Sequence, residues 1–210
     1  MRCIMKKNIA IAFSLIFLWA GSASAVMLSF QQSSLAVDVG TSFSVDLIVS
    51  QSNPTAVISV GEFDIDVLYD PTQMAFTGWT LDTFLGDSYL DLEAMDLSWG
   101  DMGGGVIDLA ELSLLLPDEL NALQSDSSFR LASLGFECLA AGQSIIALDA
   151  QDPYLVVGDG LGNALPLDLG PGVEVTQGGT APVPEPATML LFGTGLAGFA
   201  GNYLRKQKKA

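Results

Sequence analysis

An alternation of apolar and polar residues with a period of two runs through the middle of this chain. The pattern is typical of strands with one buried face, and it excludes a mainly helical architecture, whose apolar residues recur every three to four positions. Four segments carry it, with the apolar rows Phe43, Val45, Leu47 and Val49; Phe63, Ile65, Val67 and Tyr69; Leu112, Leu114 and Leu116, set against Glu111 and Ser113; and Ala132, Leu134, Phe136 and Cys138. Each row needs a second apolar layer to cover it, so we predict two packed sheets.

Turn-forming residues separate these segments, for example at Asn53-Pro54, Asp70-Pro71 and Gly103 to Gly105. Many short strands with such spacing predict an all-β antiparallel sandwich. Residues 117–124 depart from the pattern, because proline and two acidic residues at their start suit the first turn of a helix. We therefore expect one short helix there.

The first 25 residues have the layout of a secretory signal peptide. Basic residues precede an apolar run at 9–20, and the segment ends in the small residues Ala23-Ser24-Ala25. We predict that signal peptidase recognises Ala23 and Ala25, so that the mature chain begins at Val26. Cys138 is then the sole cysteine of the mature protein, and no internal disulfide forms.

The last 28 residues contain three segments in a characteristic order. The motif Val183-Pro184-Glu185-Pro186 comes first, followed by an uncharged stretch at 187–204 that is long enough for one transmembrane helix. A basic end at 205–210 predicts a cytoplasmic C-terminus. The residues before the motif, 177–182, are interpreted as a flexible spacer.

These three segments resemble the PEP-CTERM sorting signal of exopolysaccharide-producing Gram-negative bacteria. The resemblance implies recognition by an exosortase, a membrane protease or transpeptidase that removes the tail near the Pro-Glu-Pro motif. The protein would pass through the inner membrane and end at the cell surface or in the extracellular matrix. The alternative is a permanent single-pass anchor, in which Pro184 and Pro186 only stop the helix.

The domain between the two ends, residues 26–182, contains one basic residue, Arg130, and 23 acidic residues, which gives a formal charge of −22. Such a surface repels phosphate backbones, so nucleic acid is excluded as a partner. The acidity suits solubility outside the cell, and Ca²⁺ binding is a second interpretation because this ion takes carboxylate oxygens. No EF-hand loop is present, and the candidate ligands are Asp64, Asp66, Asp70, Asp101 and Asp108.

The domain contains no histidine and no lysine, which excludes Ser-His-Asp, Cys-His and Ser-Lys nucleophile systems and histidine-ligated metal sites. Cys138 lies in the apolar row of a strand and is interpreted as a core thiol. Paired carboxylates remain, as in glycoside hydrolases, but the many acidic residues single out no pair. We therefore predict that the protein is not an enzyme and needs no cofactor.

Three segments, 37–45, 63–71 and 129–142, resemble the corresponding segments of cohesin modules. The resemblance covers residues 28–175, and its most specific part is Tyr69-Asp70-Pro71. It implies a jelly-roll-like sandwich of about nine strands over residues 26–176, related in fold to some carbohydrate-binding modules. Cohesins bind dockerin partners through one face of the sandwich, whereas this tail indicates a different surface system, so the partner stays open.

Binding is the function class that remains, and the candidate ligand contacts are Trp79, Phe84, Tyr89 and Trp99, in or near the irregular middle of the domain. The alternative is that both tryptophans only close the core at strand ends. We predict a non-catalytic module of the exopolysaccharide layer that binds a protein or a polysaccharide. A carbohydrate-binding module is the first alternative, and a carboxylate-based glycoside hydrolase is the second.

Overall fold

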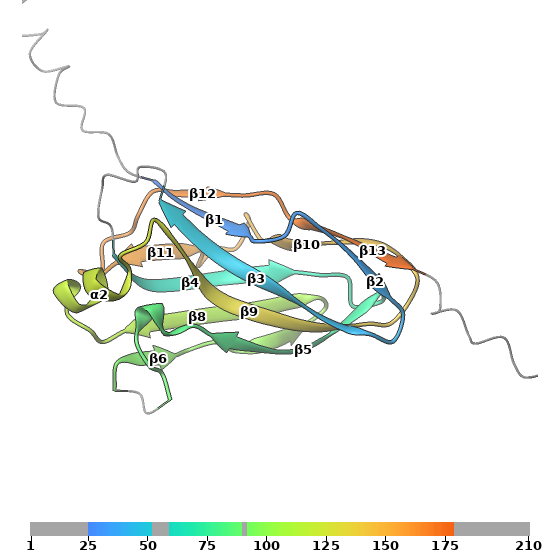
Figure 1. The fold of residues 1–210 in the computed structure, drawn as a ribbon, viewed down its shortest axis with the longest axis horizontal. Helices are drawn as coiled ribbons and strands as arrows, with labels where there is room; N and C mark the ends of the chain where they lie inside the picture. The colour runs from blue at the N-terminus through green and yellow to red at the C-terminus, as the bar shows by residue number, and fades with distance from the viewer. Residues whose placement is uncertain (1–24, 52–58, 90–91, 179–210) are drawn as a thin grey trace, which may run out of the picture.

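The computed structural model describes residues 25–51, 59–89 and 92–178, which form two sheets packed face to face (Figure 1). The first sheet has the order β12 (Leu167–Leu169), β1 (Val26–Phe30), β3 (Ser42–Gln51), β9 (Ser128–Cys138) and β5 (Met74–Leu81). The second has the order β2 (Ser34–Asp38), β13 (Val173–Gly178), β10 (Gly142–Leu148), β4 (Val60–Leu68), β8 (Val106–Ser113) and β6 (Ala94–Asp96). The predicted antiparallel sandwich is confirmed, although β1 pairs with β12, and β2 with β13, in parallel.

The described residues form thirteen strands, against the nine or so expected, because short strands share the edges of two long ones. β11 (Val156–Asp159) and β10 both pair with the same edge of β4. In the same way, β7 (Gly100–Gly103) and β6 both pair with one edge of β8. The last strand, β13, includes the first two residues of the predicted spacer, and Gln177 in it is buried.

Three of the four predicted apolar rows point into the core between the sheets. Val45 and Leu47 of β3, Ile65 and Val67 of β4, and the row from Ala132 to Cys138 of β9 are all at most 1 % exposed. Cys138 is buried, as predicted for a core thiol, and burial raises its pKa. Apolar surface removed from water in this way contributes roughly 25 cal/mol per Å², so the burial of these rows stabilises the packed sheets.

The prediction for the fourth row is wrong about the buried face. In β8 the inward positions are Ile107, Leu109 and Glu111, and Glu111 is only 1 % exposed. Leu114 and Leu116 follow the end of the strand and are 47 % and 67 % exposed. Each inward residue of β8 lies opposite an inward residue of β4, with Glu111 opposite Phe63. The register with β4 therefore determines the buried face of β8.

The predicted helix is confirmed as α2 (Pro117–Leu123), at one end of the sandwich (Figure 1). The Glu119 carboxylate accepts a hydrogen bond from the backbone N–H of Leu116, which satisfies one of the unpaired donors at the helix start. Buried Gln124 then ties the helix end to β4, because its side chain accepts from Val60 N at 2.7 Å and donates to Val60 O at 2.7 Å. Among the described residues, no helix is both long and apolar enough to cross a membrane.

Candidate functional site

A depression of about 680 Å³ lies on the outer face of the second sheet, over β4, β7 and β8. Its wall is completed by the loop between β10 and β11, which contributes Asp152, Pro153 and Tyr154. The lining residues are Asp64, Asp66, Trp99, Met102, Gly103, Val106, Asp108, Asp152, Pro153 and Tyr154. We call this the acidic depression. It brings together three of the predicted acidic candidates and one of the predicted aromatic ones.

The acidic side chains stand together because of strand alternation and register. Asp64 and Asp66 occupy the outward positions of β4, where Phe63, Ile65 and Val67 point inward. Asp66 lies directly opposite Asp108 of β8 in the antiparallel ladder. Like charges at directly opposed positions repel and destabilise a sheet, so this arrangement is costly for the isolated domain.

The same repulsion, together with partial burial, changes the pKa values of the acids on β4. Partial burial, followed by the charges of Asp152, Asp108, Asp149 and Asp64, raises the pKa of Asp66 to about 6. Burial and the charges of Asp108 and Asp152 also raise the pKa of Asp64. One oxygen of Asp152 is buried and accepts no hydrogen bond. The depression therefore favours a positively charged occupant, which would restore the charge of these acids.

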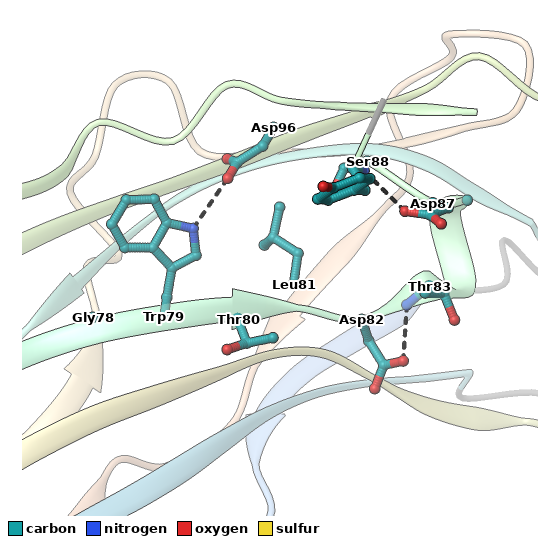
Figure 2. Close-up of a pocket in the computed structure, with 11 residues that line it drawn as sticks. Gly78, Trp79, Thr80, Leu81, Asp82, Thr83, Asp87, Ser88 and Asp96 are labelled. Atoms are coloured by element: carbon teal, nitrogen blue, oxygen red, sulfur yellow. Dashed lines mark hydrogen bonds between the residues drawn. The ribbon is translucent and has the colours of Figure 1, made fainter. Parts of the chain in front are cut away.

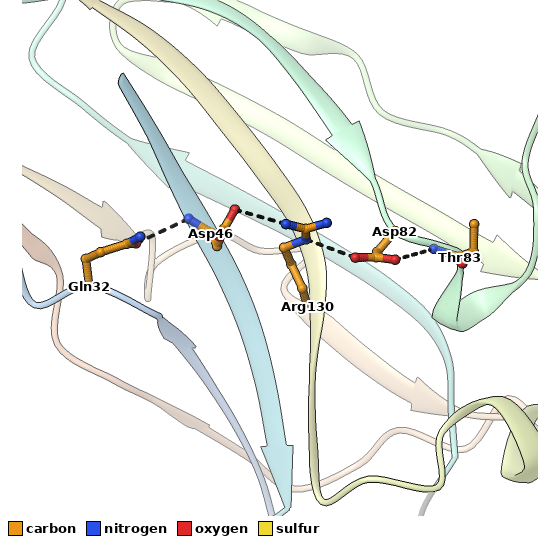
Figure 3. Close-up of polar contacts among 5 residues, drawn as sticks. All are labelled: Gln32, Asp46, Asp82, Thr83 and Arg130. Carbon is orange, nitrogen blue, oxygen red and sulfur yellow. Dashed lines mark hydrogen bonds and ion pairs between the residues drawn. The ribbon is translucent and has the colours of Figure 1, made fainter. Parts of the chain in front are cut away.

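The single basic residue of the domain does not neutralise the depression. Arg130 lies on β9 of the first sheet, where its Nε contacts Asp82 Oδ2 at 2.9 Å and its Nη1 lies 3.7 Å from Asp46 Oδ1 (Figure 3). Its side chain is 45 % exposed, as expected for the surface ion pair that the sequence suggests. None of the described residues that line the acidic depression is a cation.

Large exposed side chains flank the acids. Trp99 is 79 % exposed, Tyr154 is 74 % exposed and Met102 is 57 % exposed. The backbone N–H of Trp99 donates to Asp108 Oδ1 at 2.7 Å, which holds this segment against β8. Exposed aromatic rings beside charged groups are common contact residues in protein interfaces and sugar sites.

Trp79 lies elsewhere, at the open edge between the two sheets. Its indole N–H donates to Asp96 Oδ2 at 3.3 Å (Figure 2). One ring face packs on Phe76 with 6.2 Å between centroids. Gly100 sits so close to the ring that a Cβ atom there would lie 2.6 Å from it. Trp79 thus joins β5 to β6 and β7.

The other two aromatic candidates are also outside the acidic depression. Tyr89 is 86 % exposed and lines a second pocket of about 430 Å³, together with Trp79, Asp82 and Asp96 (Figure 2). Phe84 is partly buried and packs on Phe129, with 4.9 Å between ring centroids. The structure therefore separates the four predicted aromatics into three environments.

The remaining calcium candidates have local partners. Asp70 closes a turn by accepting from the backbone and hydroxyl of Thr72, and these hydrogen bonds lower its pKa. Asp101 accepts from the hydroxyl of Tyr69 at 3.4 Å and from the backbone of Gly103. Within the part of the chain that the structure describes, no group of three or more acidic, histidine or cysteine side chains is arranged to hold a metal ion.

Sequence reasoning did not identify Met102, Asp152 and Tyr154 as site residues. Asp152-Pro153 predicts only a turn, and the tyrosine directly after it was the available signal. The loop reaches β4 through the backbone N–H of Asp149, which donates to Asp66 O at 2.9 Å. This long-range contact places the loop beside the acids of β4.

The architecture is that of cohesin modules. Solved structures with this fold include the cohesin module of a Clostridium perfringens family 33 glycoside hydrolase, at 15 % identity and a TM-score of 0.54, covering 74 % of this chain and 98 % of that one. Another is CaCohA2 of Clostridium acetobutylicum, at 18 % identity and a TM-score of 0.53, covering 78 % and 99 %. A third is the OlpA cohesin of Clostridium thermocellum in complex with a dockerin, at 12 % identity and a TM-score of 0.54, covering 73 % and 99 %.

At these identities the likeness defines the fold alone, and the domain is a cohesin-like β-sandwich. A comparison with curated proteins found no match. The model of the PEP-CTERM protein-sorting motif matches residues 182–206. The chain therefore carries a PEP-CTERM sorting signal, which indicates export and sorting to the cell surface. The predicted signal peptide, motif, transmembrane helix and basic end lie outside the described residues, except for Ala25.

Proposed function

We propose that this protein is a non-catalytic binding module of the cell surface or extracellular matrix, and that the acidic depression contacts another exported protein. The supporting observation is the combination of four clustered carboxyl groups, no neighbouring cation and the exposed side chains of Trp99 and Tyr154. The cohesin-like fold adds support, since the OlpA cohesin is solved in complex with a protein partner.

The chemistry of the depression describes the partner. A lysine or arginine side chain could lie between Asp66 and Asp108 and relieve their repulsion. Apolar groups next to it would cover Trp99, Met102 and Tyr154. Charge complementarity of this kind speeds association and depends on salt, whereas the buried apolar contacts control dissociation. We expect a partner surface with a basic residue flanked by apolar ones.

Sorting determines where this binding takes place. In the proposed sequence of events, signal peptidase cleaves after Ala25, and an exosortase removes the tail near Pro186. The mature domain then becomes part of the exopolysaccharide layer. If the tail is retained, the domain instead stays anchored in the inner membrane by a single helix, with the C-terminus in the cytoplasm.

Capture experiments with the mature protein test the proposal. Proteins of the host's extracellular fraction are identified on immobilised wild type, and the affinity of the recovered partner is then measured for variants. Asp66→Lys should weaken it at least tenfold, because the charge in the depression is inverted. Asp126→Lys makes the same charge change at an exposed position outside the depression and should have little effect. Equal weakening by both variants would refute the assignment.

A matched aromatic pair separates the depression from the second pocket. Trp99→Ala should weaken partner binding, while Tyr89→Ala, which removes an equally exposed ring elsewhere, should not. If only Tyr89→Ala weakens binding, the interface lies at the second pocket and the proposed site is wrong.

Polysaccharide binding is the second candidate, and the exposure of Trp99 beside hydrogen-bonding carboxylates favours it. An indole ring can cover the apolar face of a sugar while polar groups bind its hydroxyls. Tryptophan fluorescence of wild type and Trp99→Phe, titrated with the host's own polysaccharides, tests it. Unchanged emission removes this candidate, and release of reducing ends during the same incubation would instead support the hydrolase.

Calcium binding is tested on the same samples. A bound ion that favours the folded state raises the melting temperature. The described residues contain no group of three carboxylates arranged around one ion, so we expect equal melting temperatures in chelator and in millimolar Ca²⁺, and a higher value in Ca²⁺ would support the calcium interpretation of the sequence.

A further inference from the structure

Glu111 is the most anomalous acidic residue among those that the structure describes. It occupies an inward position of β8, is 1 % exposed, and neither of its carboxyl oxygens has a hydrogen-bond partner. Buried polar groups without partners cost free energy and are rare in native proteins, so each calls for an explanation.

The groups around Glu111 supply no compensating charge. On β4 the residue opposite it is Phe63, and on β6 the residue opposite it is Asp96. Asp82, just after β5, is the other acid whose charge acts on it. The neighbouring 3₁₀ turn η2 (Thr83–Leu85) carries no titratable side chain. Among the residues that the structure describes, the one cation is Arg130 of β9, and it is already paired with Asp82.

Both neighbouring carboxylates have donors of their own. Asp96 accepts from Trp79 Nε1 and from the backbone of Ser98. Asp82 accepts from Thr83 N at 2.8 Å and from Arg130. These hydrogen bonds do not extend to Glu111, and no described group donates to either of its carboxyl oxygens.

The strand that pairs with β8 opposite Glu111 on the outer side is β6. β6 contains three residues and lies at the edge of its sheet. It is flanked by the bonds Leu97 N to Ala110 O at 2.8 Å and Leu114 N to Glu93 O at 2.7 Å. The indole of Trp79 reaches across from the other sheet to Asp96 at the end of this strand (Figure 2).

We propose that Glu111 and β6 form an acid-closed latch at this edge of the sandwich. While Glu111 keeps its proton, β6 stays on β8 and Trp79 stays bonded to Asp96. Loss of the proton drives the strand away from β8, admits water to the carboxylate and opens the second pocket between the sheets.

The direction of the pH response follows from the two states. In the closed state, burial and then the charges of Asp96 and Asp82 raise the pKa of Glu111 from 4.5 to about 8. In the open state water reaches the carboxyl group and its pKa returns towards the ordinary value, so opening releases a proton. The equilibrium constant for opening should therefore rise up to about tenfold per pH unit between pH 4.5 and about 8, and level off above it.

Native-state hydrogen exchange of the mature protein tests the latch. Protection factors, corrected for intrinsic exchange, are measured for the amides of Leu97 and Leu114 from pH 5 to pH 9. In wild type they should fall about tenfold per unit up to pH 8 and then stay constant. Glu111→Gln keeps the shape of the side chain without the titration, and its protection factors should not depend on pH.

The controls separate local opening from other effects. Asp66→Asn, which removes the other strongly shifted acid, should keep the wild-type slope at Leu97 and Leu114. Glu111→Leu provides a second non-titrating variant in case Glu111→Gln weakens the fold. The protection factors of amides in β3 and β9 should depend less on pH than those of Leu97 and Leu114 beside β6. A pH slope retained by both Glu111 variants, a flat wild-type profile, or an equal slope throughout the protein would each overturn the proposal.

Discussion

Asp66 and Asp108 lie directly opposite each other on β4 and β8, where two acids share one face of the sheet without a cation. Asp66 has a pKa of about 6 in the folded protein against an ordinary value of 3.8. As pH rises, the unfolded chain loses the Asp66 proton at a lower pH than the folded protein does. The contribution of this proton to the free energy of unfolding is therefore fully present below pH 3.8 and is lost as pH rises to about 6. Stability should therefore fall across this interval.

Asp66→Asn should remove that loss. At pH 7 we expect the variant to unfold with a free energy higher by about 1–2 kcal/mol, allowing for partial solvent screening, and to match wild type near pH 4. Urea titrations at four pH values between 4 and 7 measure the difference. Asp126→Asn is the matched control, and an equal gain in that variant would show that the effect is general charge reduction.

Gln124 should be important for stability although it does not line the acidic depression. Its side chain satisfies both backbone groups of buried Val60 and also donates to Phe84 O at 2.9 Å. Gln124→Leu leaves these groups without partners, so we expect a loss of about 2–4 kcal/mol in urea denaturation. Leu123→Ala, at an exposed neighbouring position, should cost less than about 1 kcal/mol.

Gly100 is required by both its backbone conformation and its contact with Trp79. Its φ angle is 71°, and an added Cβ would lie 2.6 Å from the indole ring. Gly100→Ala should destabilise the protein by roughly 2–4 kcal/mol and change the tryptophan emission. Gly104 has a similar φ of 68° but open space around it, so Gly104→Ala should show only the conformational cost of about 1 kcal/mol. Equal losses would mean that the Trp79 contact is unimportant.

The ion pairs of Arg130 should contribute little to stability. The Arg130 side chain is 45 % exposed, and its partners Asp46 and Asp82 are 18 % and 20 % exposed (Figure 3). Arg130→Met should therefore change the free energy of unfolding by less than about 1 kcal/mol, and the difference should shrink further in high salt. A larger loss that persists in roughly molar salt would show that the pair is more shielded than its exposure indicates.

The sorting signal makes a prediction about the mature ends of the chain. The intact mass of the protein from native cells should correspond to a start at Val26 and an end near Pro186. Replacing Pro184, Glu185 and Pro186 with alanine should leave the tail attached and the protein in the membrane fraction. Thr180→Ala, just before the motif, should be processed normally. Normal processing of the triple-alanine variant would refute recognition of the motif.

Much of the architecture was predictable because it depends on local patterns. Alternation in β3, β4 and β9 identifies both the strands and their buried faces, and proline followed by two acids locates α2. The short strands β6, β7, β11 and β12 were not separately predictable. They hold three or four residues each, too few for a periodic signal, and they form because a longer neighbour offers them an edge.

The candidate site was predictable only in part. No sequence pattern distinguishes Asp64, Asp66 and Asp108 from the many other acidic residues of the domain. Asp152 also lies far from Asp108 along the chain, with α2, β9 and β10 between them. The sequence does not distinguish Trp79 from Trp99 as ligand contacts. In the structure Trp79 joins the two sheets, whereas Trp99 is exposed. Exposure depends on what packs against a side chain, which a linear pattern does not contain.

The C-terminal sorting signal, the sandwich class and the lack of histidine and lysine in residues 26–182 follow from the sequence alone, because each depends on residue types or on neighbours along the chain. Which acids meet, and which face of β8 is buried, depends on contacts between strands that are distant in the chain. In 106–113 two alternating rows compete, and the row containing Glu111 points inward because Ile107 and Leu109 lie opposite Val67 and Ile65 in the β4 ladder. Burial of those four apolar side chains outweighs the cost of burying one carboxyl group, provided that the group keeps its proton.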